Sequence, residues 1–208
     1  MTKPVRTVAP ASLPVPLDEA KSRLGISGTD EDATLTALIG AATDYLDGRT
    51  GALGRCLITQ TWAFHLDYWP SCGHMVLPFP DVQSVVVTYR DTDDAEQTLA
   101  GGEFEVFEAD CGSVLEFIGT LPNLSDRNRA VTITMTVGYG EASDVPETIR
   151  SAIILTVSRL RNLSSDAAFL RSETVEGVGS QSWSTTDAGR SIGSAVDALV
   201  APYRRVFL

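Results

Sequence analysis

The 208-residue chain has 43% hydrophobic and 21% charged residues, which is typical of a folded globular protein and excludes a disordered chain. Its formal net charge of −11 argues against a protein built to grip nucleic acid, because phosphate binding needs clustered lysine and arginine. The three cysteines are scattered and odd in number, so they imply no disulfide framework.

The N-terminal region predicts an extended arm followed by two helices. Residues 1–16 are rich in proline and alanine, and no apolar segment follows the first positive charges, so we expect no signal peptide. A short helix is predicted over residues 17–24, with Gly25 as its stop signal. A second, amphipathic helix follows the acidic residues 30–32, and its apolar stripe consists of Leu35, Leu38, Ile39, Ala42, Tyr45 and Leu46. Residues 1–56 should therefore form the arm and two helices of a helical body.

The central third of the chain changes to the two-residue period of β-strands. Candidate strands lie at residues 58–68, 82–89, 104–107 and 113–118. The clearest strand is 131–137, where valine, isoleucine and methionine alternate with threonine. Turn-rich spacers separate these runs, which favours antiparallel pairing. We therefore predict an inserted antiparallel β subdomain over residues 57–137.

A third helix is predicted after the glycine-tyrosine-glycine sequence at residues 138–140, from Pro146 to about residue 163. Residues 138–163 would complete the helical body. The helix is apolar almost all the way round, so it should be deeply buried or shared with a neighbour, and the small size of the chain favours a neighbour. Its apolar run is shorter than the ~20 residues that a membrane span needs. The residues that we assign to subunit–subunit packing are Ile153, Ile154, Leu155 and Val157.

The C-terminal quarter, residues 164–208, is predicted to form an extended arm with one helical turn near residues 196–200. Its end carries two arginines, two aromatic residues and an apolar terminus, which favours a docking segment over solvent-exposed coil. The docking residues would be Leu199, Pro202, Tyr203, Arg204, Arg205 and Phe207. The predicted fold is therefore α+β: a helical bundle of N-terminal and C-terminal-half helices, an inserted antiparallel β subdomain and an extended C-terminal arm.

Three short motifs could suggest chemistry, and each lacks its structural context. Residues 189–193 match the nucleophile elbow around Ser191, but no apolar strand precedes them and both histidines come earlier in the chain. Cys72 and His74 could begin a metal site, yet no second pair with ligand spacing follows. Residues 91–94 lack the glycine and final glutamate of a calcium loop and predict a hairpin turn. We therefore predict no enzyme, no metal site and no cofactor, and we interpret His65 as a solvated side chain.

Several segments in chain order carry a resemblance to a known family. They are LDEAKSRL at 17–24 followed by the acidic residues 30–32, ITQTW at 58–62, TMTVGYG at 134–140 leading to IRSAI at 149–153, RSETVEG at 171–177, and LVAPYR at 199–204. Together they resemble the head-tail connector family of adaptor and head-completion proteins in tailed phages and gene transfer agents. The resemblance covers nearly the whole chain.

The resemblance implies a structural subunit of a virion or phage-like particle, located at the head-tail junction and assembled in the bacterial host cytoplasm. Such adaptors form a ring, typically dodecameric, beneath the portal protein, and their C-terminal segment docks on the portal. A stopper or tail component binds below, DNA passes through the lumen without specific binding, and no membrane is involved. Two alternatives stay open: a stopper or tail-side protein of the same particle, and a free-standing β-type binding module with exposed aromatics such as Trp69 and Trp183.

Overall fold

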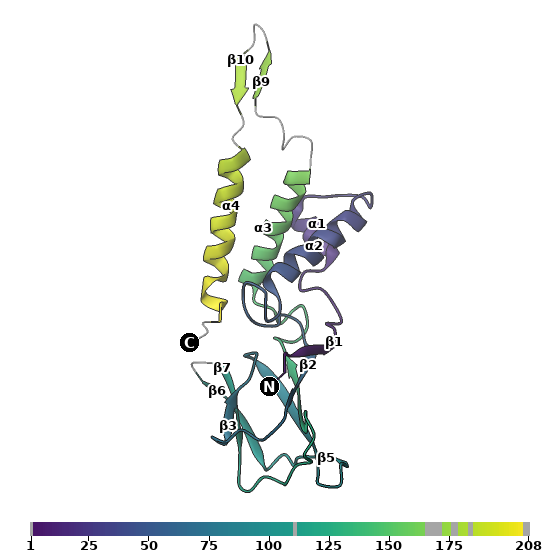
Figure 1. Ribbon diagram of the computed structural model, residues 1–208. Coiled ribbons are helices and arrows are strands. Elements are labelled where there is room, and N and C mark those ends of the chain that lie inside the picture. The colour runs from purple at the N-terminus through teal and green to yellow at the C-terminus, as the bar shows by residue number, and fades with distance from the viewer. Residues whose placement is uncertain (1, 110–111, 165–171, 176–178, 183–184, 206–208) are drawn as a thin grey trace.

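The computed structural model describes residues 2–109, 112–164, 172–175, 179–182 and 185–205, with the backbone alone between residues 163 and 191. The molecule is elongated, with a helical part at one end and a β part at the other (Figure 1). The mixed α+β class predicted from the sequence is confirmed.

The helical part contains α1 (Leu17–Leu24), α2 (Asp32–Leu46), α3 (Glu147–Ser164) and α4 (Thr185–Val200). Helix α1 ends at Gly25, whose left-handed backbone at φ 64° directs its N–H toward the carbonyls of Lys21 and Ser22. Helix α3 lies between α2 and α4 (Figure 1). The first three helices agree with the predicted ranges to within a residue or two.

One apolar core joins the four helices. Ile149, Ile153 and Val157 of α3 are fully buried at its centre, and Val200 of α4 is fully buried against it. Helix α2 adds the buried members of its predicted apolar stripe, Leu35, Ile39, Ala42 and Leu46. The apolar residues on the different sides of α3 therefore pack within the chain, because α1, α2 and α4 all contact this helix.

The β part has two sheets, in which all paired strands are antiparallel as predicted. The five-stranded sheet has the order β1-β2-β8-β4-β5, and the three-stranded sheet has the order β3-β7-β6. Their bounds are β1 (Val5–Val8), β2 (Gln60–Leu66), β3 (His74–Val76), β4 (Val82–Arg90), β5 (Glu96–Thr98), β6 (Phe104–Ala109), β7 (Gly112–Phe117) and β8 (Val131–Val137).

A second apolar core lies between the two sheets. Phe64, Ile133 and Met135 enter it from the five-stranded sheet, and Leu115 enters it from β7; all four are fully buried. The alternating threonines of β8 therefore point to the opposite, outer surface of their sheet. The β part has a core of its own, separate from the helical core.

Short strands at the edges were not predicted. Four residues of the N-terminal arm form β1, which pairs with β2 at the edge of the five-stranded sheet. Strands β3 and β5 contain three residues each, too few for alternation to be visible in the sequence. None of the described helices is long and apolar enough to cross a membrane.

The extended C-terminal arm predicted for residues 164–208 is not what the structure has over its described part. Strands β9 (Ser172–Val175) and β10 (Gly179–Ser182) pair as a hairpin beyond the ends of α3 and α4 (Figure 1). Residues 185–200 then form four turns of helix, where one turn was predicted. Two glycines, Gly189 and Gly193, weaken the local helical signal, and packing of Val196 and Val200 on the helical core overrides it.

Candidate functional site

The predicted docking segment is folded against its own chain. Helix α4 continues into a 3-10 turn, η2 (Ala201–Tyr203), and both Leu199 and Tyr203 pack half-buried against the helical core. Val200 between them is fully buried. These side chains stabilise the chain that carries them, and they are not available as a free tail.

Arg205 connects the helical part with the β part. Its backbone N–H donates to the Leu53 carbonyl at 3.0 Å. Its guanidinium donates to the carbonyls of Leu77 at 3.0 Å and Pro78 at 2.5 Å. Nη2 also lies 3.0 Å from the point that a Cβ at Gly112 would occupy, so glycine leaves space for the arginine there. Arg205 was predicted to dock on a partner, and the structure uses its donors inside the chain.

The exposed part of the docking segment is small. Pro202 and Arg204 are exposed, and Arg204 forms an ion pair with Asp197 of α4 at 2.5 Å. Both side chains of this pair keep 40–58% of their surface accessible, so the pair contributes little to stability. Phe207 lies outside the described residues. A partner can therefore contact this segment at the exposed side chains of Pro202 and Arg204.

A half-buried carboxylate holds the start of the β part against the end of α2. Asp47 Oδ1 accepts the Leu57 N–H at 2.6 Å, and Oδ2 accepts from Gln60 Nε2 at 3.1 Å. Burial raises the pKa of Asp47 above its ordinary value, and the two hydrogen bonds partly offset this shift. Asp47 thus satisfies backbone and side-chain donors at the point where the chain leaves the helical part.

Arg55 makes a second polar link at the same junction. Its Nη1 donates to Asp81 Oδ2 at 3.0 Å and to the Tyr139 hydroxyl at 2.6 Å. The guanidinium carbon lies 5.7 Å from the centroid of the Tyr139 ring. Burial raises the pKa of the Asp81 carboxyl, and the positive charge of Arg55 opposes that shift. Three segments far apart in the sequence are held together by this one side chain.

The assignment of α3 to subunit contacts is wrong for most of the residues chosen. Ile153 and Val157 are fully buried and Ile154 is 7% exposed, all within a single chain. The physical reason is α4, which covers the face of α3 that the sequence left without a partner. Leu155 is half-buried and packs at the edge of the same core, so its contact with another subunit stays a prediction.

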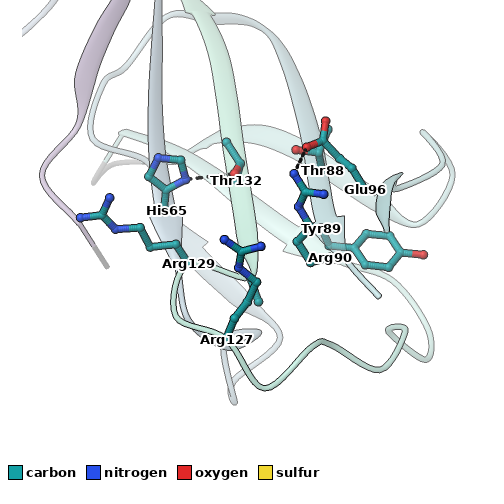
Figure 2. A pocket seen from close by; sticks show the side chains of 9 residues that line it. His65, Thr88, Tyr89, Arg90, Glu96, Arg127, Arg129 and Thr132 are labelled. Atoms are coloured by element: carbon teal, nitrogen blue, oxygen red, sulfur yellow. Dashed lines mark hydrogen bonds and ion pairs between the residues drawn. The ribbon is translucent and has the colours of Figure 1, made fainter. Parts of the chain in front are cut away.

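A cluster of arginines borders a pocket of about 310 Å³ on the outer surface of the five-stranded sheet (Figure 2). His65 Nδ1 lies 2.9 Å from Thr132 Oγ1, so this histidine is half-buried and partnered, where we had predicted a solvated side chain. Around it are Arg90, Arg127 and Arg129, which the sequence did not single out. They meet because β4 pairs with β8 and places the loop before β8 beside the end of β4.

The charges of this cluster are largely compensated. Arg90 pairs with Glu96 at 2.9 Å, and Arg127 pairs with Asp94 at 3.1 Å. The side chain of Arg129 makes no ion pair among the described residues and is exposed. The pocket therefore has one guanidinium, that of Arg129, without an ion pair among the described residues. Beside it are two exposed ion pairs whose carboxylates a partner could replace.

The motifs considered for catalysis and metal binding have ordinary structural roles. Residues 189–193 lie within α4, so no strand-to-helix elbow exists around Ser191. Cys72 Sγ donates to the His74 carbonyl at 3.0 Å, and His74 Nδ1 lies 3.1 Å from the Cys72 carbonyl oxygen. Among the described residues no group of three or more histidine, cysteine or acidic side chains is arranged to hold a metal.

Two other predictions have clear outcomes. The hairpin turn at residues 91–94 is confirmed, because Asp91 Oδ1 accepts the N–H groups of Asp93 and Ala95 and closes the connection between β4 and β5. Trp69 is half-buried against the β core and donates its Nε1–H to the Pro122 carbonyl at 2.9 Å, so its interpretation as an exposed aromatic is wrong. Trp183 lies outside the described residues.

Comparison with known proteins finds a family match in the N-terminal part of the chain. Residues 15–64, which include α1, α2 and most of β2, match the family model described as phage gp6-like head-tail connector protein. The resemblance to head-tail connectors is confirmed. Over its full length, the chain has a fold similar to that of chains in gene transfer agent (GTA) particles.

Three solved structures are similar, and each covers 100% of this chain and 97% of its counterpart. They are the neck of an empty GTA particle computed with C6 symmetry (TM-score 0.73, 19% identity), the virion of a native GTA particle (0.70, 22%) and the neck of a native GTA particle computed with C12 symmetry (0.69, 20%). At these identities the likeness establishes a shared fold. No curated protein matched the sequence.

Proposed function

We propose that this chain is a head-tail connector adaptor, a structural subunit that forms a ring beneath the portal of a tailed phage or gene transfer agent. It links the capsid to the tail at the head-tail junction and lines the DNA channel. The observation that carries the proposal is the likeness over the whole chain to a chain of GTA necks, together with the connector family match over residues 15–64. The role is structural, without catalysis or cofactor.

The charge of the chain suits this role. A net charge of −11 gives a surface that repels phosphate, so DNA can pass through a lumen without being held. The C6 and C12 symmetries of the similar neck structures support a ring, with a dodecamer as the expected form. The helical bundle would form the rigid body of the ring, because its four helices share one core.

Portal docking is assigned to the exposed end of the C-terminal segment. Deleting residues 199–208 would be a poor test, since it removes the buried Val200 and the hydrogen bonds of Arg205 and would disturb the fold itself. Removing residues 206–208 together with Arg204→Glu leaves those contacts in place. Loss of portal attachment by this variant, with unchanged thermal stability, is the expected result.

The decisive experiment is co-purification of this chain with the portal protein from the same genome, read by native mass and by electron microscopy. A ring of this chain beneath the portal would establish the adaptor. Binding to a preassembled portal–adaptor complex but not to the portal alone would instead assign the stopper role. A stable monomer with no affinity for either would favour a free-standing β-type module.

A further inference from the structure

The outer face of the three-stranded sheet has two unusual rows of side chains. In one row Val76, Val114 and Phe107 lie opposite one another across β3, β7 and β6. Val76 and Phe107 remain 43% and 42% exposed, although both are apolar, whereas Val114 between them is 6% exposed. In the next row Glu116 lies directly opposite Glu105. We call this surface the acidic face: Val76, Val114, Phe107, Glu105 and Glu116.

The two glutamates of the acidic face repel each other, and His74, which lies opposite Glu116 on β3, makes no ion pair with either of them. Like charges at directly opposite positions of an antiparallel pair destabilise a sheet. Neither Glu105 nor Glu116 forms an ion pair with any described residue. Exposed apolar side chains beside an unpaired acidic pair are the composition of a protein contact surface whose partner is basic at the matching place.

The outer face of the five-stranded sheet has the complementary composition. Its apolar row contains Val5 on β1 and Val86 on β4, which are 61% and 48% exposed. Further along the same face are the arginines of Figure 2, where Arg129 lacks an ion pair among the described residues and Arg127 is held only by the exposed Asp94. We call this surface the basic face: Val5, Val86, Arg90, Arg127 and Arg129.

The two faces point in opposite directions, because the β core lies between the sheets that carry them. Contact between the acidic face of one copy and the basic face of the next is therefore heterologous, and such contacts form a ring when the rotation from copy to copy closes. We propose that neighbouring copies of this chain join through these two faces. The inference rests on the proposed ring and names the surfaces that form it.

A second copy fits the basic face better than DNA does. Asp94 and Glu96 pair with two of its arginines, and Asp67 accepts the backbone N–H of Arg129 at 2.7 Å. These carboxylates leave too little net positive charge for a phosphate backbone, which is bound through clusters of uncompensated lysine and arginine. A glutamate pair carried on a matching apolar surface can replace the exposed Asp94 at Arg127 and pair directly with Arg129.

Two charge-reversal variants test the contact. The first is Glu105→Lys with Glu116→Lys, which makes the acidic face basic. The second is Arg127→Glu with Arg129→Glu, which makes the basic face acidic. The control, Asp18→Lys with Asp30→Lys, makes the same charge change as the first variant on exposed positions of the helical part. Circular dichroism and melting temperature establish that each variant folds.

Ring formation on the portal is then counted by electron microscopy and native mass. We expect each reversal alone to lower the yield of complete rings by about tenfold or more, because like charges then face each other in every contact. The control should form rings as the unmodified chain does. A one-to-one mixture of the two reversals should restore rings in which the two variants alternate, since each contact again joins opposite charges.

Several results would overturn the inference. Normal rings from either reversal alone, or no rescue by the mixture, would mean that the copies join elsewhere. Normal rings with weaker DNA retention by the Arg127→Glu/Arg129→Glu variant would assign the basic face to phosphate. If the unmodified chain forms no ring on the portal, the proposed function fails first, so the two failures are distinguishable.

Discussion

Replacing Arg205 by alanine should loosen the C-terminal segment from both parts of the molecule. The guanidinium donates to the carbonyls of Leu77 and Pro78, and these donations are lost while the backbone bond to Leu53 can remain. Hydrogen bonds that involve a charged group contribute about 1.5–3 kcal/mol to stability. We expect Arg205→Ala to lower the free energy of unfolding by an amount in this range, which corresponds to a fall of several degrees in melting temperature.

The neighbouring arginine provides a matched control. Arg204 makes only an exposed ion pair with Asp197, and such pairs contribute about 0–1 kcal/mol. Arg204→Ala removes the same charge one residue away and should therefore leave stability almost unchanged. Both variants are measured by urea unfolding with linear extrapolation. Amide hydrogen exchange adds the location: protection should fall first in the last turns of α4 in the Arg205→Ala variant.

A clear result would refute this reasoning. If Arg204→Ala lowers the free energy of unfolding as much as Arg205→Ala does, then positive charge near the C-terminus stabilises the fold and the hydrogen bonds of Arg205 do not. If Arg205→Lys is as stable as the unmodified chain, the planar, multiple-donor guanidinium is unnecessary at this position.

Three further predictions concern the core, a turn and a half-buried carboxylate. Ile153→Ala should lower the free energy of unfolding of the isolated chain by about 2–5 kcal/mol, and Leu155→Ala, at a half-buried site, by clearly less, as measured by urea unfolding. Gly138→Ala should cost more than about 1 kcal/mol, because its φ is 122° and a Cβ would lie 2.6 Å from a backbone oxygen; Gly102→Ala, with open space, should be close to neutral in thermal melts. The folded state raises the pKa of Asp47, so it binds that proton more tightly than the unfolded chain does, and the contribution of this residue to stability falls as pH rises from the ordinary value of 3.8 through the raised one. Asp47→Asn should remove this pH dependence from chemical denaturation curves, and an unchanged pH profile would contradict it.

The strong periodic segments were predictable because one local pattern determines each of them. The alternation at 131–137 predicts β8 to the residue. Four members of the predicted apolar stripe of α2 are buried, whereas its Tyr45 is 54% exposed and the buried Thr43 lies outside it. In both cases the side chains that face the core recur at the period of the element. Local sequence therefore predicts which face is buried even when the partner of that face is unknown.

For α3, the sequence did not predict which element packs against its apolar face. Its apolar surround indicated a neighbour, but one sequence does not distinguish a neighbour in the same chain from one in another copy. The neighbour is α4, whose two glycines and many serines and threonines give weak helix propensity. The arginines of the basic face were missed for a related reason, since Arg90 and Arg127 come together only through strand pairing and a loop.

The two apolar cores do not by themselves fix how the β part is oriented on the helical part. Three polar side chains between them do: Asp47 holds Leu57 and Gln60, Arg55 holds Asp81 and Tyr139, and Arg205 reaches from the end of η2 to the carbonyls beside β3. Hydrogen bonds are directional, whereas apolar contacts are not. This junction therefore fixes the angle between the β part and the helical part, which a purely apolar interface would leave variable. In the proposed ring the β part carries the acidic and basic faces, whereas the docking segment ends the helical part, so this junction sets the angle between the contacts of neighbouring copies and the contacts with the portal. Weakening the junction should therefore lower ring closure on the portal even in variants whose two cores remain intact.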